Sequence, residues 1–329
     1  MNPAFPILNP RSRDANRPRG VCALGVMAKA PRAGAAKTRL APPLTHAEAA
    51  RLSACFLRDT AANVAAACLE SSHAARPAAR PVAVYTPAGA ESAFDELLPA
   101  GFALLAQRGD DLGARLFNAS VDLLRLGFES CCLINSDSPT LPRALLTSAV
   151  AELARPGRRL VLGPSDDGGY YLIGLKHAPA RLFQEIAWST SVVLAQTIER
   201  ARDIALDVTL LPAWYDVDDA STLRRLCDEL FDTHDDNDDG AHGDDDTHGD
   251  GDGARVDDDA RDALRPLPPA TTPLDSHPAT QLDARAATGL APYPAPHTRD
   301  VLARLLAGEG HARLLSNFDG ARSRGKGRA

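Results

Sequence analysis

Short apolar runs alternate with amphipathic segments along one long part of the chain, from about residue 21 to residue 231. The apolar runs predict buried strands, and apolar residues spaced three or four apart predict helices that cover them. The predicted strands occupy residues 22–28, 81–85, 102–106, 131–135, 159–163, 170–174 and 207–211. The predicted helices begin near 45 and 141 and cover about 111–126, 179–186, 190–203 and 219–231.

This alternation of strands and helices predicts an α/β fold with a mostly parallel sheet covered on both faces. Thr45 and Glu48 form a capping-box pattern that marks the start of the first helix. In such sheets, ligands bind outside the carboxyl ends of the strands. The polar clusters of the chain fall at those ends, so we look for the chemistry there.

The two ends of the chain lack this pattern. Residues 1–20 are rich in proline, arginine and asparagine and are expected to form a flexible leader. Residues 232–298 are first acidic and then rich in proline and alanine, a composition typical of disorder. Residues 299–329 are expected to be a tail, in which 299–307 could form one short amphipathic helix.

The charge of the chain is unevenly distributed. The total is −7, but residues 232–262 hold fourteen aspartates and two arginines, so this tract alone carries −12 and the rest about +5. A mild positive excess fits an anionic small-molecule substrate, and we expect no nucleic-acid partner. The acidic tract could instead contact a basic partner. A calcium-loop-like spacing and three histidines in this tract are more simply explained by chance spacing among its many aspartates (Asp235, Asn237, Asp239, Gly240, Asp246, His234, His242, His248).

The six cysteines form no CxxC pair and several lie in apolar runs, so we expect buried thiols in a reducing compartment. No segment is long and apolar enough for a signal peptide or a membrane span. We therefore expect a cytoplasmic protein.

The first polar cluster is the stretch KAPRAGAAKTRL, which directly follows the first predicted strand. Gly34 allows a turn whose N–H groups can hold phosphate oxygens, while Lys37 and Arg39 supply positive charge. Lysine is rare in this chain, yet Lys29 and Lys37 lie close together here. The spacing matches neither a P-loop nor a dinucleotide fingerprint, and an ordinary basic surface turn is the alternative interpretation.

Two further clusters place carboxylates at strand ends. Asp137, in the sequence NSDSP, follows the strand 131–135 and could bind Mg²⁺ or Mn²⁺, or cap the next helix. Asp216 and Asp218, in DVDD, precede the last helix and could both face one site or provide favourable charge at the helix N-terminus.

Three more clusters complete the set. In GPSDDGGY, Gly168 and Gly169 suit a tight hairpin, which does not explain the two adjoining acids. In GDDLGARL, Asp110 is a candidate helix N-cap. In WST, Thr190 is a candidate cap of the following helix.

Taken in order, KAPRAGAAKTRL, GDDLGARL, NSDSPTL, GPSDDGGYYLIGL, WST and DVDD resemble a bacterial glycosyltransferase family of GT-A fold associated with arsenosugar biosynthesis. That family is similar to the guanylyltransferases that act on molybdopterin and phospholactate. The resemblance covers about 21–231 and implies a nucleotide-diphospho-sugar transferase fold, Rossmann-like, with three α/β/α layers and a mixed, mostly parallel sheet. Asn135 and Leu116 depart from the family pattern, which usually has a small residue and a methionine there.

The resemblance also implies roles for individual residues. The residues that would hold the nucleotide are Lys29, Gly34, Lys37, Thr38, Arg39, Asp111 and Arg115. Those that would line the sugar or acceptor side are Asp166, Asp167, Gly168, Gly169, Trp188 and Thr190. Asp137 and Asp218 would bind Mg²⁺ or Mn²⁺. No residue stands out as a catalytic base.

Three functions are consistent with these observations. The first is a metal-dependent transferase that moves a glycosyl group from a nucleotide-diphosphate sugar to a small-molecule acceptor. The second is a nucleotidyltransferase that joins an NTP to a phosphorylated small molecule and releases pyrophosphate. The third is a non-catalytic nucleotide-binding module with an acidic interaction tail.

Overall fold

A computed structural model of the chain describes residues 5–11, 18, 20–72, 78–231, 289–308, 310 and 312–314. Its centre is one seven-stranded sheet with the strand order β3-β2-β1-β4-β6-β5-β7. The strands are β1 (Cys22–Lys29), β2 (Ala79–Thr86), β3 (Ala103–Ala106), β4 (Ser130–Ile134), β5 (Arg159–Pro164), β6 (Tyr170–Leu175) and β7 (Asp207–Leu210). The acidic tract and its calcium-loop-like spacing lie outside the described residues.

Six of the strands run in one direction and β6 alone runs against them, paired with β4 on one side and β5 on the other. The expected α/β fold with a mixed, mostly parallel sheet is confirmed. All five residues of β4 are buried, as expected for a central strand with both faces covered.

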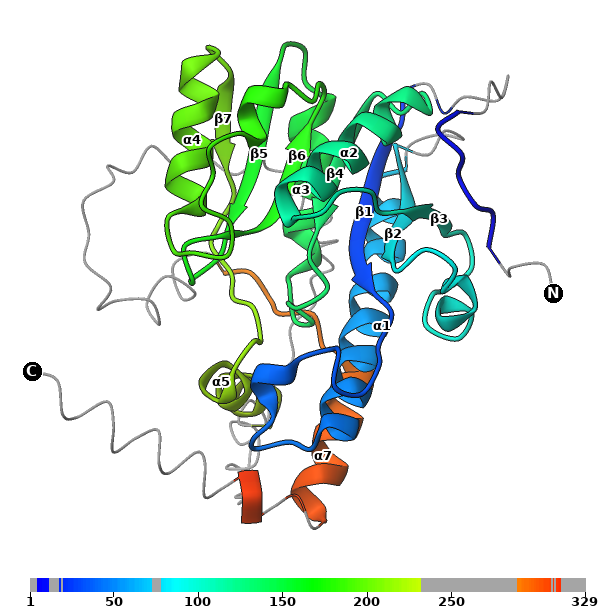
Figure 1. Ribbon diagram of the computed structural model, residues 1–329, viewed down its shortest axis with the longest axis vertical. Coiled ribbons are helices and arrows are strands. Elements are labelled where there is room, and N and C mark those ends of the chain that lie inside the picture. The colour runs from blue at the N-terminus through cyan, green and yellow to red at the C-terminus, as the bar shows by residue number, and fades with distance from the viewer. Residues whose placement is uncertain are drawn as a thin grey trace, which may run out of the picture.

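Helices cover both faces of this sheet (Figure 1). One face packs against α1 (His46–Glu70) and α3 (Arg143–Ala154), and the other against α2 (Leu112–Arg125) and α4 (Val193–Asp203). Each face of the sheet has its own buried apolar cluster. The structure therefore has the three expected layers, helices, sheet and helices. Two further helices, α5 (Ala220–Phe231) and α7 (Pro296–Ala307), pack beside the turn after β1 and beside α1 respectively.

The local signals for helix starts were only partly reliable. Thr45 and Glu48 form both hydrogen bonds of the capping box, as predicted. Thr190 does not cap α4, which begins at Val193, because its hydroxyl donates instead to the carbonyl of Ala187 at 2.6 Å. The helix expected over 179–186 is a single 3₁₀ turn, Ala180–Phe183.

Two terminal segments are packed against the domain. Residues 6–8, which the sequence placed in a flexible leader, run parallel to β3, with Ile7 opposite Leu104 and backbone hydrogen bonds on both sides. Residues 289–298, which it placed in the Pro/Ala-rich segment, lead into α7, and the residues 299–307 expected to be helical lie within it. The N–H of Tyr293 donates to the carbonyl of Thr140 at 3.0 Å.

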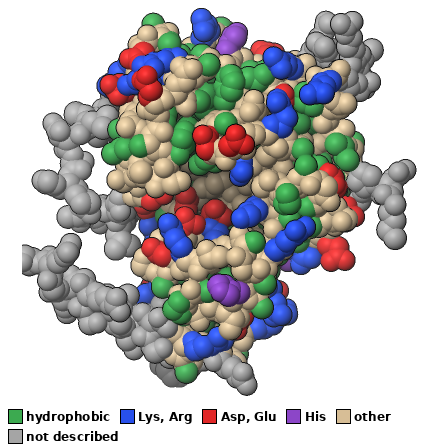
Figure 2. Space-filling model, in the orientation of Figure 1, with side chains coloured by type: hydrophobic (Ala, Val, Ile, Leu, Met, Phe, Trp, Pro, Cys, Tyr) green, Lys and Arg blue, Asp and Glu red, His purple; other side chains and the backbone are tan. Residues whose placement is uncertain are grey.

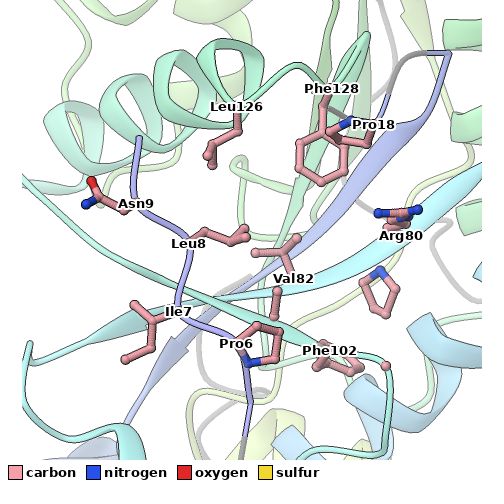
Figure 3. A pocket seen from close by; sticks show the side chains of 13 residues that line it. Pro6, Ile7, Leu8, Asn9, Pro18, Arg80, Val82, Phe102, Leu126 and Phe128 are labelled. Atoms are coloured by element: carbon pink, nitrogen blue, oxygen red, sulfur yellow. The ribbon is translucent and has the colours of Figure 1, made fainter. Parts of the chain in front are cut away.

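A cavity of about 450 Å³ lies between the N-terminal segment and the sheet (Figure 3). Arg80 and Val82 from β2 and Phe102 before β3 line it, so it lies at the amino ends of these strands. It is therefore remote from the strand ends that carry the predicted chemistry. Within the described part of the chain, no helix has the length and apolar character needed to cross a membrane. All six cysteines are buried thiols that form no disulfide within the described part of the chain, as expected.

Candidate functional site

The candidate site lies at the carboxyl edge of the sheet, where the segments that follow β1 and β4 meet. These two strands are parallel neighbours in register, with Val26 opposite Ile134, so the chain leaves both at the same edge. A third segment, residues 214–219, returns to this edge, and the N–H of Val217 donates to the carbonyl of Asp137 at 2.9 Å. Figure 2 shows a hollow in the middle of this face of the molecule, with acidic and basic side chains gathered around it.

Lys37 links these three segments. Its Nζ lies 2.7 Å from Oδ1 of Asp137 and 2.7 Å from Oδ1 of Asp218. Arg39 reaches Oδ2 of Asp218 at 3.3 Å from an exposed position. Burial lowers the pKa of Lys37, but the two carboxylates raise it by more, so the net shift is upward and the ammonium stays charged. Two predicted metal ligands and one predicted phosphate ligand are therefore in direct contact.

The turn that presents Lys37 is shaped by unusual backbone conformations. Gly34 has φ of 75° and open space around it, and Lys37 itself has φ of 50°, in the left-handed region. Lys29, which the resemblance placed in this turn, reaches across it and donates from Nζ to the carbonyl of Ala35 at 2.8 Å. Thr38 opens the short 3₁₀ helix Thr38–Leu40 that follows. This geometry holds the Lys37 side chain in the site at the cost of a strained residue.

Asp216 forms a second layer beneath the Lys37 contacts. Its Oδ1 accepts hydrogen bonds from Nδ2 of Asn135 and Oγ of Ser138, each at 2.8 Å. Burial and the nearby carboxylate of Asp137 raise the pKa of Asp216 to about 6. These bonds fasten the segment after β4 to the segment before α5.

The sequence pointed to the motifs that contain Asn135, Ser138 and Asp216, but it did not predict that these three residues contact one another. The signal lay in the two acids of DVDD, spaced two apart. Asp218 joins Asp137 in the site, while Asp216 is turned inward toward Asn135 and Ser138.

The two acids of the β5–β6 connection have different environments. Oδ2 of Asp166 lies 2.6 Å from Nη1 of Arg225, whose guanidinium stacks 3.9 Å from the centre of the Tyr215 ring. Arg225, in α5, was not identified from the sequence, because nothing local relates it to Asp166. Among the described residues, Asp167 accepts a single, short-range hydrogen bond, from the N–H of Gly169 at 2.9 Å. Its carboxylate is therefore the freer of the two to meet a ligand.

The hairpin glycine Gly168 allows a close approach of two loops. It has φ of 87°, and a Cβ placed on it would lie 2.0 Å from the carbonyl oxygen of Ser191. Its own carbonyl accepts from the N–H of Leu194 at 2.9 Å. The β5–β6 connection is thus packed directly onto the segment that follows the WST motif.

The GDDLGARL and WST motifs meet at a second close contact. A Cβ on Gly113 would lie 2.2 Å from the indole nitrogen of Trp188, so only glycine fits beneath this ring. Asp111, rather than the expected Asp110, caps α2, and its Oδ1 accepts from the N–H of Ala114 at 2.7 Å. Arg115 donates from Nε to the carbonyl of Gly109 at 3.0 Å. In these contacts both Asp111 and Arg115 serve the start of α2, and a nucleotide-binding role for them stays a prediction.

The described site residues therefore form two groups. Lys37, Arg39, Asp137 and Asp218 are joined by ion pairs. The segments around Gly113, Gly168 and Trp188 pack together through glycines. The segment before α5 links the two groups, because the N–H of Asp166 in the β5–β6 connection donates to the carbonyl of Trp214 at 3.0 Å.

Comparison with known proteins found one matching family model and several similar solved structures. A family model described as "Uncharacterized protein conserved in bacteria (DUF2064)" matches residues 69–190. The solved structure of a candidate nucleotide-diphospho-sugar transferase from Desulfovibrio desulfuricans G20 is 30% identical in sequence. The alignment covers 67% of this chain and 90% of that one, with a TM-score of 0.57. No match was found among curated proteins.

More distant structures are also similar. A CMP:2-keto-3-deoxy-manno-octonic acid synthetase in complex with CTP is 9% identical, with 63% of this chain and 96% of that one aligned and a TM-score of 0.39. An inositol-1-phosphate CTP transferase from T. maritima is 12% identical, with 61% and 90% aligned and a TM-score of 0.37. At these scores neither likeness bears on what this chain does.

Proposed function

Because the chain belongs to the DUF2064 family and shares its fold with the Desulfovibrio protein, we propose that it is a metal-dependent transferase that uses a nucleotide-diphosphate sugar. The acceptor of the glycosyl group would be a small molecule. The observation that carries this proposal is the contact of Lys37 with both Asp137 and Asp218 at the carboxyl edge of the sheet. Chains of this architecture bind their ligands at that edge.

The residues present fit a divalent cation. The ammonium of Lys37 marks one position that is 2.7 Å from an oxygen of each carboxylate. Carboxylate oxygens are the ligands that Mg²⁺ prefers, and this ion is commonly held by one or two carboxylates together with substrate phosphates. Among the described residues there is no group of three or more His, Cys, Asp or Glu side chains arranged to hold a metal, so Asp137 and Asp218 would be the protein's share of the ligands. When bound, the cation would neutralise charge on the diphosphate.

The residues of the chain would then bind and orient the donor. Gly34 and the turn around it can approach phosphate closely, and Lys37 and Arg39 supply the charge. Asp216 keeps the segment after β4 in place through Asn135 and Ser138. We propose that Asp167 and Trp188 face the sugar or acceptor. Such a site would act by positioning and charge neutralisation.

Nucleotidyl transfer is the second candidate, because the same cation and the same lysine would serve an NTP equally well. The two reactions differ in their products. Release of pyrophosphate from an NTP in the presence of phosphorylated small molecules would favour nucleotidyl transfer. Release of a nucleoside diphosphate from a nucleotide sugar would favour glycosyl transfer. Tight nucleotide binding with no turnover of either kind would favour a non-catalytic module.

The first experiment is a thermal-shift screen of the full chain with UDP- and GDP-sugars and NTPs, each with and without Mn²⁺. A ligand at about 100 times its Kd stabilises the folded chain by about 2.7 kcal/mol. We expect such a shift only with nucleotide and Mn²⁺ together, and we expect Asp137→Asn to abolish it. The matched control is Asp207→Asn, at an exposed carboxylate in β7. No metal-dependent shift with any nucleotide would contradict the proposal.

A further inference from the structure

The Lys37 ammonium occupies the position between two carboxylates that a divalent cation would need. The Lys37 side chain is only 7% exposed, whereas those of Asp137 and Asp218 are 36% and 38% exposed. The ring of Phe56 lies 5.8 Å from Nζ on the inner side. The acids therefore remain accessible to solvent, while the ammonium that contacts both of them is held beneath.

The charges of these side chains disfavour binding of a nucleotide without a divalent cation, and of a divalent cation without a nucleotide. Two carboxylates against one ammonium leave a net negative charge, which repels a nucleotide diphosphate. Arg39 offsets this only from an exposed position, where its charge is screened. A divalent cation, in turn, must compete with an ammonium that both carboxylates already contact.

We infer that Lys37 is a resident cation that exchanges partners, so that the site takes up a divalent cation and nucleotide phosphates together, as one complex. The cation replaces the ammonium between Asp137 and Asp218, and the ammonium contacts phosphate instead. The flexible four-carbon stem of lysine permits this exchange. The inference rests on the proposed function and adds that the nucleotide binds as a complex with the divalent cation.

The exchange of partners by Lys37 predicts binding affinities that simple electrostatic attraction between the site and its ligands does not predict. Removing a positive charge from the Lys37 position should tighten binding of Mn²⁺ alone, because the competing ammonium is gone. It should weaken binding of the nucleotide, because a phosphate ligand is gone. In the unmodified chain, UDP or GDP and Mn²⁺ should each tighten binding of the other by the same factor, because coupling between two ligands is reciprocal.

The experiment measures Mn²⁺ binding to the full chain from the signal of free Mn²⁺ in electron paramagnetic resonance, without nucleotide and then with UDP or GDP. The variant is Lys37→Met, with Lys37→Gln as a second replacement if the first does not fold. The matched control is Lys176→Met, since Lys176 follows β6 outside the site and donates to the carbonyl of Arg155 instead of a carboxylate. Lys37→Met combined with Asp137→Asn tests whether the metal binds at this site.

We expect Lys37→Met to bind Mn²⁺ alone about ten-fold or more tightly than the unmodified chain, within the usual range of coupling between two sites. Lys176→Met should bind Mn²⁺ like the unmodified chain, and the double variant should lose the gain. Equal Mn²⁺ affinity in Lys37→Met and the unmodified chain, with tightening by nucleotide intact, would overturn the inference and leave the proposed function standing. A gain that survives Asp137→Asn would also overturn it. Absence of Mn²⁺ binding under every condition would overturn the proposed function as well.

Discussion

The carboxylate of Asp59, in the middle of α1, accepts the backbone N–H of Thr298 at 2.8 Å, although the two residues are 239 positions apart. Its other oxygen accepts the N–H of His297 at 3.1 Å. Asp59 is fully buried, and these two donors belong to the first turn of α7. An acid of α1 thus supplies the N-terminal cap that α7 lacks in its own sequence, where Ala295 precedes the helix.

This contact makes Asp59→Ala a test of how α7 is held. We expect a loss of about 1–2 kcal/mol in the free energy of unfolding, because the substitution leaves N–H groups at the start of a packed helix without acceptors. Urea unfolding followed by circular dichroism would measure it. Asp95→Ala, at an exposed carboxylate, should change stability by less than about 0.5 kcal/mol. Equal effects of the two substitutions would show that α7 does not depend on Asp59.

The capping box at the start of α1 predicts a pH dependence. Burial raises the pKa of Glu48, but hydrogen bonds from Thr45 and Arg313 lower it by more, so the net shift is downward. The stabilisation by Glu48 is therefore fully present above its unfolded pKa of about 4.3 and is lost as the pH falls toward the lowered value.

We expect Glu48→Gln to be less stable than the unmodified chain near pH 7, with a difference that shrinks by about pH 3. Urea unfolding at both pH values would measure it. Glu96→Gln, at an exposed acid near the end of the 3₁₀ turn Glu91–Phe94, is the control and should show no such trend. A difference that stays constant with pH would contradict this assignment.

Gly168 and Gly101 form a natural pair for testing the packing of the β5–β6 connection. Both have positive φ, 87° and 93°, but only at Gly168 would an added Cβ meet a neighbour, the carbonyl oxygen of Ser191 at 2.0 Å. Gly101→Ala should cost about 1 kcal/mol for its backbone conformation alone. Gly168→Ala should cost at least about 2 kcal/mol more, because backbone atoms must also move apart. Urea unfolding of both variants would measure the difference, and similar losses would mean that the contact with Ser191 is easily relieved.

Lys37→Arg tests whether the site needs a compact charge. The Lys37 side chain is 7% exposed, and its ammonium lies 2.7 Å from each of two carboxylates, in a space that a planar guanidinium does not fill in the same way. If the proposed function is right, titration calorimetry should show at least about a ten-fold loss of nucleotide affinity in the presence of Mn²⁺, or about 1.4 kcal/mol. Lys176→Arg, at a position after β6 outside the site, should retain affinity. Full affinity in Lys37→Arg would mean that the turn is an ordinary charged surface.

Local patterns were sufficient to predict the strands and most of the helices of the fold, although the helix expected over 179–186 is only a 3₁₀ turn. Buried strands such as β4 are recognisable because both of their faces are covered, which requires a continuous apolar run. The capping box at Thr45 is equally local, since both of its hydrogen bonds join residues three apart. Where a prediction depended on the exact backbone path, it was off by one residue: Asp111, not Asp110, caps α2.

The sequence by itself determined an α/β chain with polar motifs after its strands, because apolar periodicity and turn residues record which faces are buried and where strands end. It could not determine which motifs meet. Only the tertiary structure inserted β6 between β4 and β5, paired Asp166 with Arg225 and set Lys37 between Asp137 and Asp218. The physical reason is that these contacts join residues far apart in the chain. Their partners are chosen by how the sheet is ordered and packed, which no local pattern encodes.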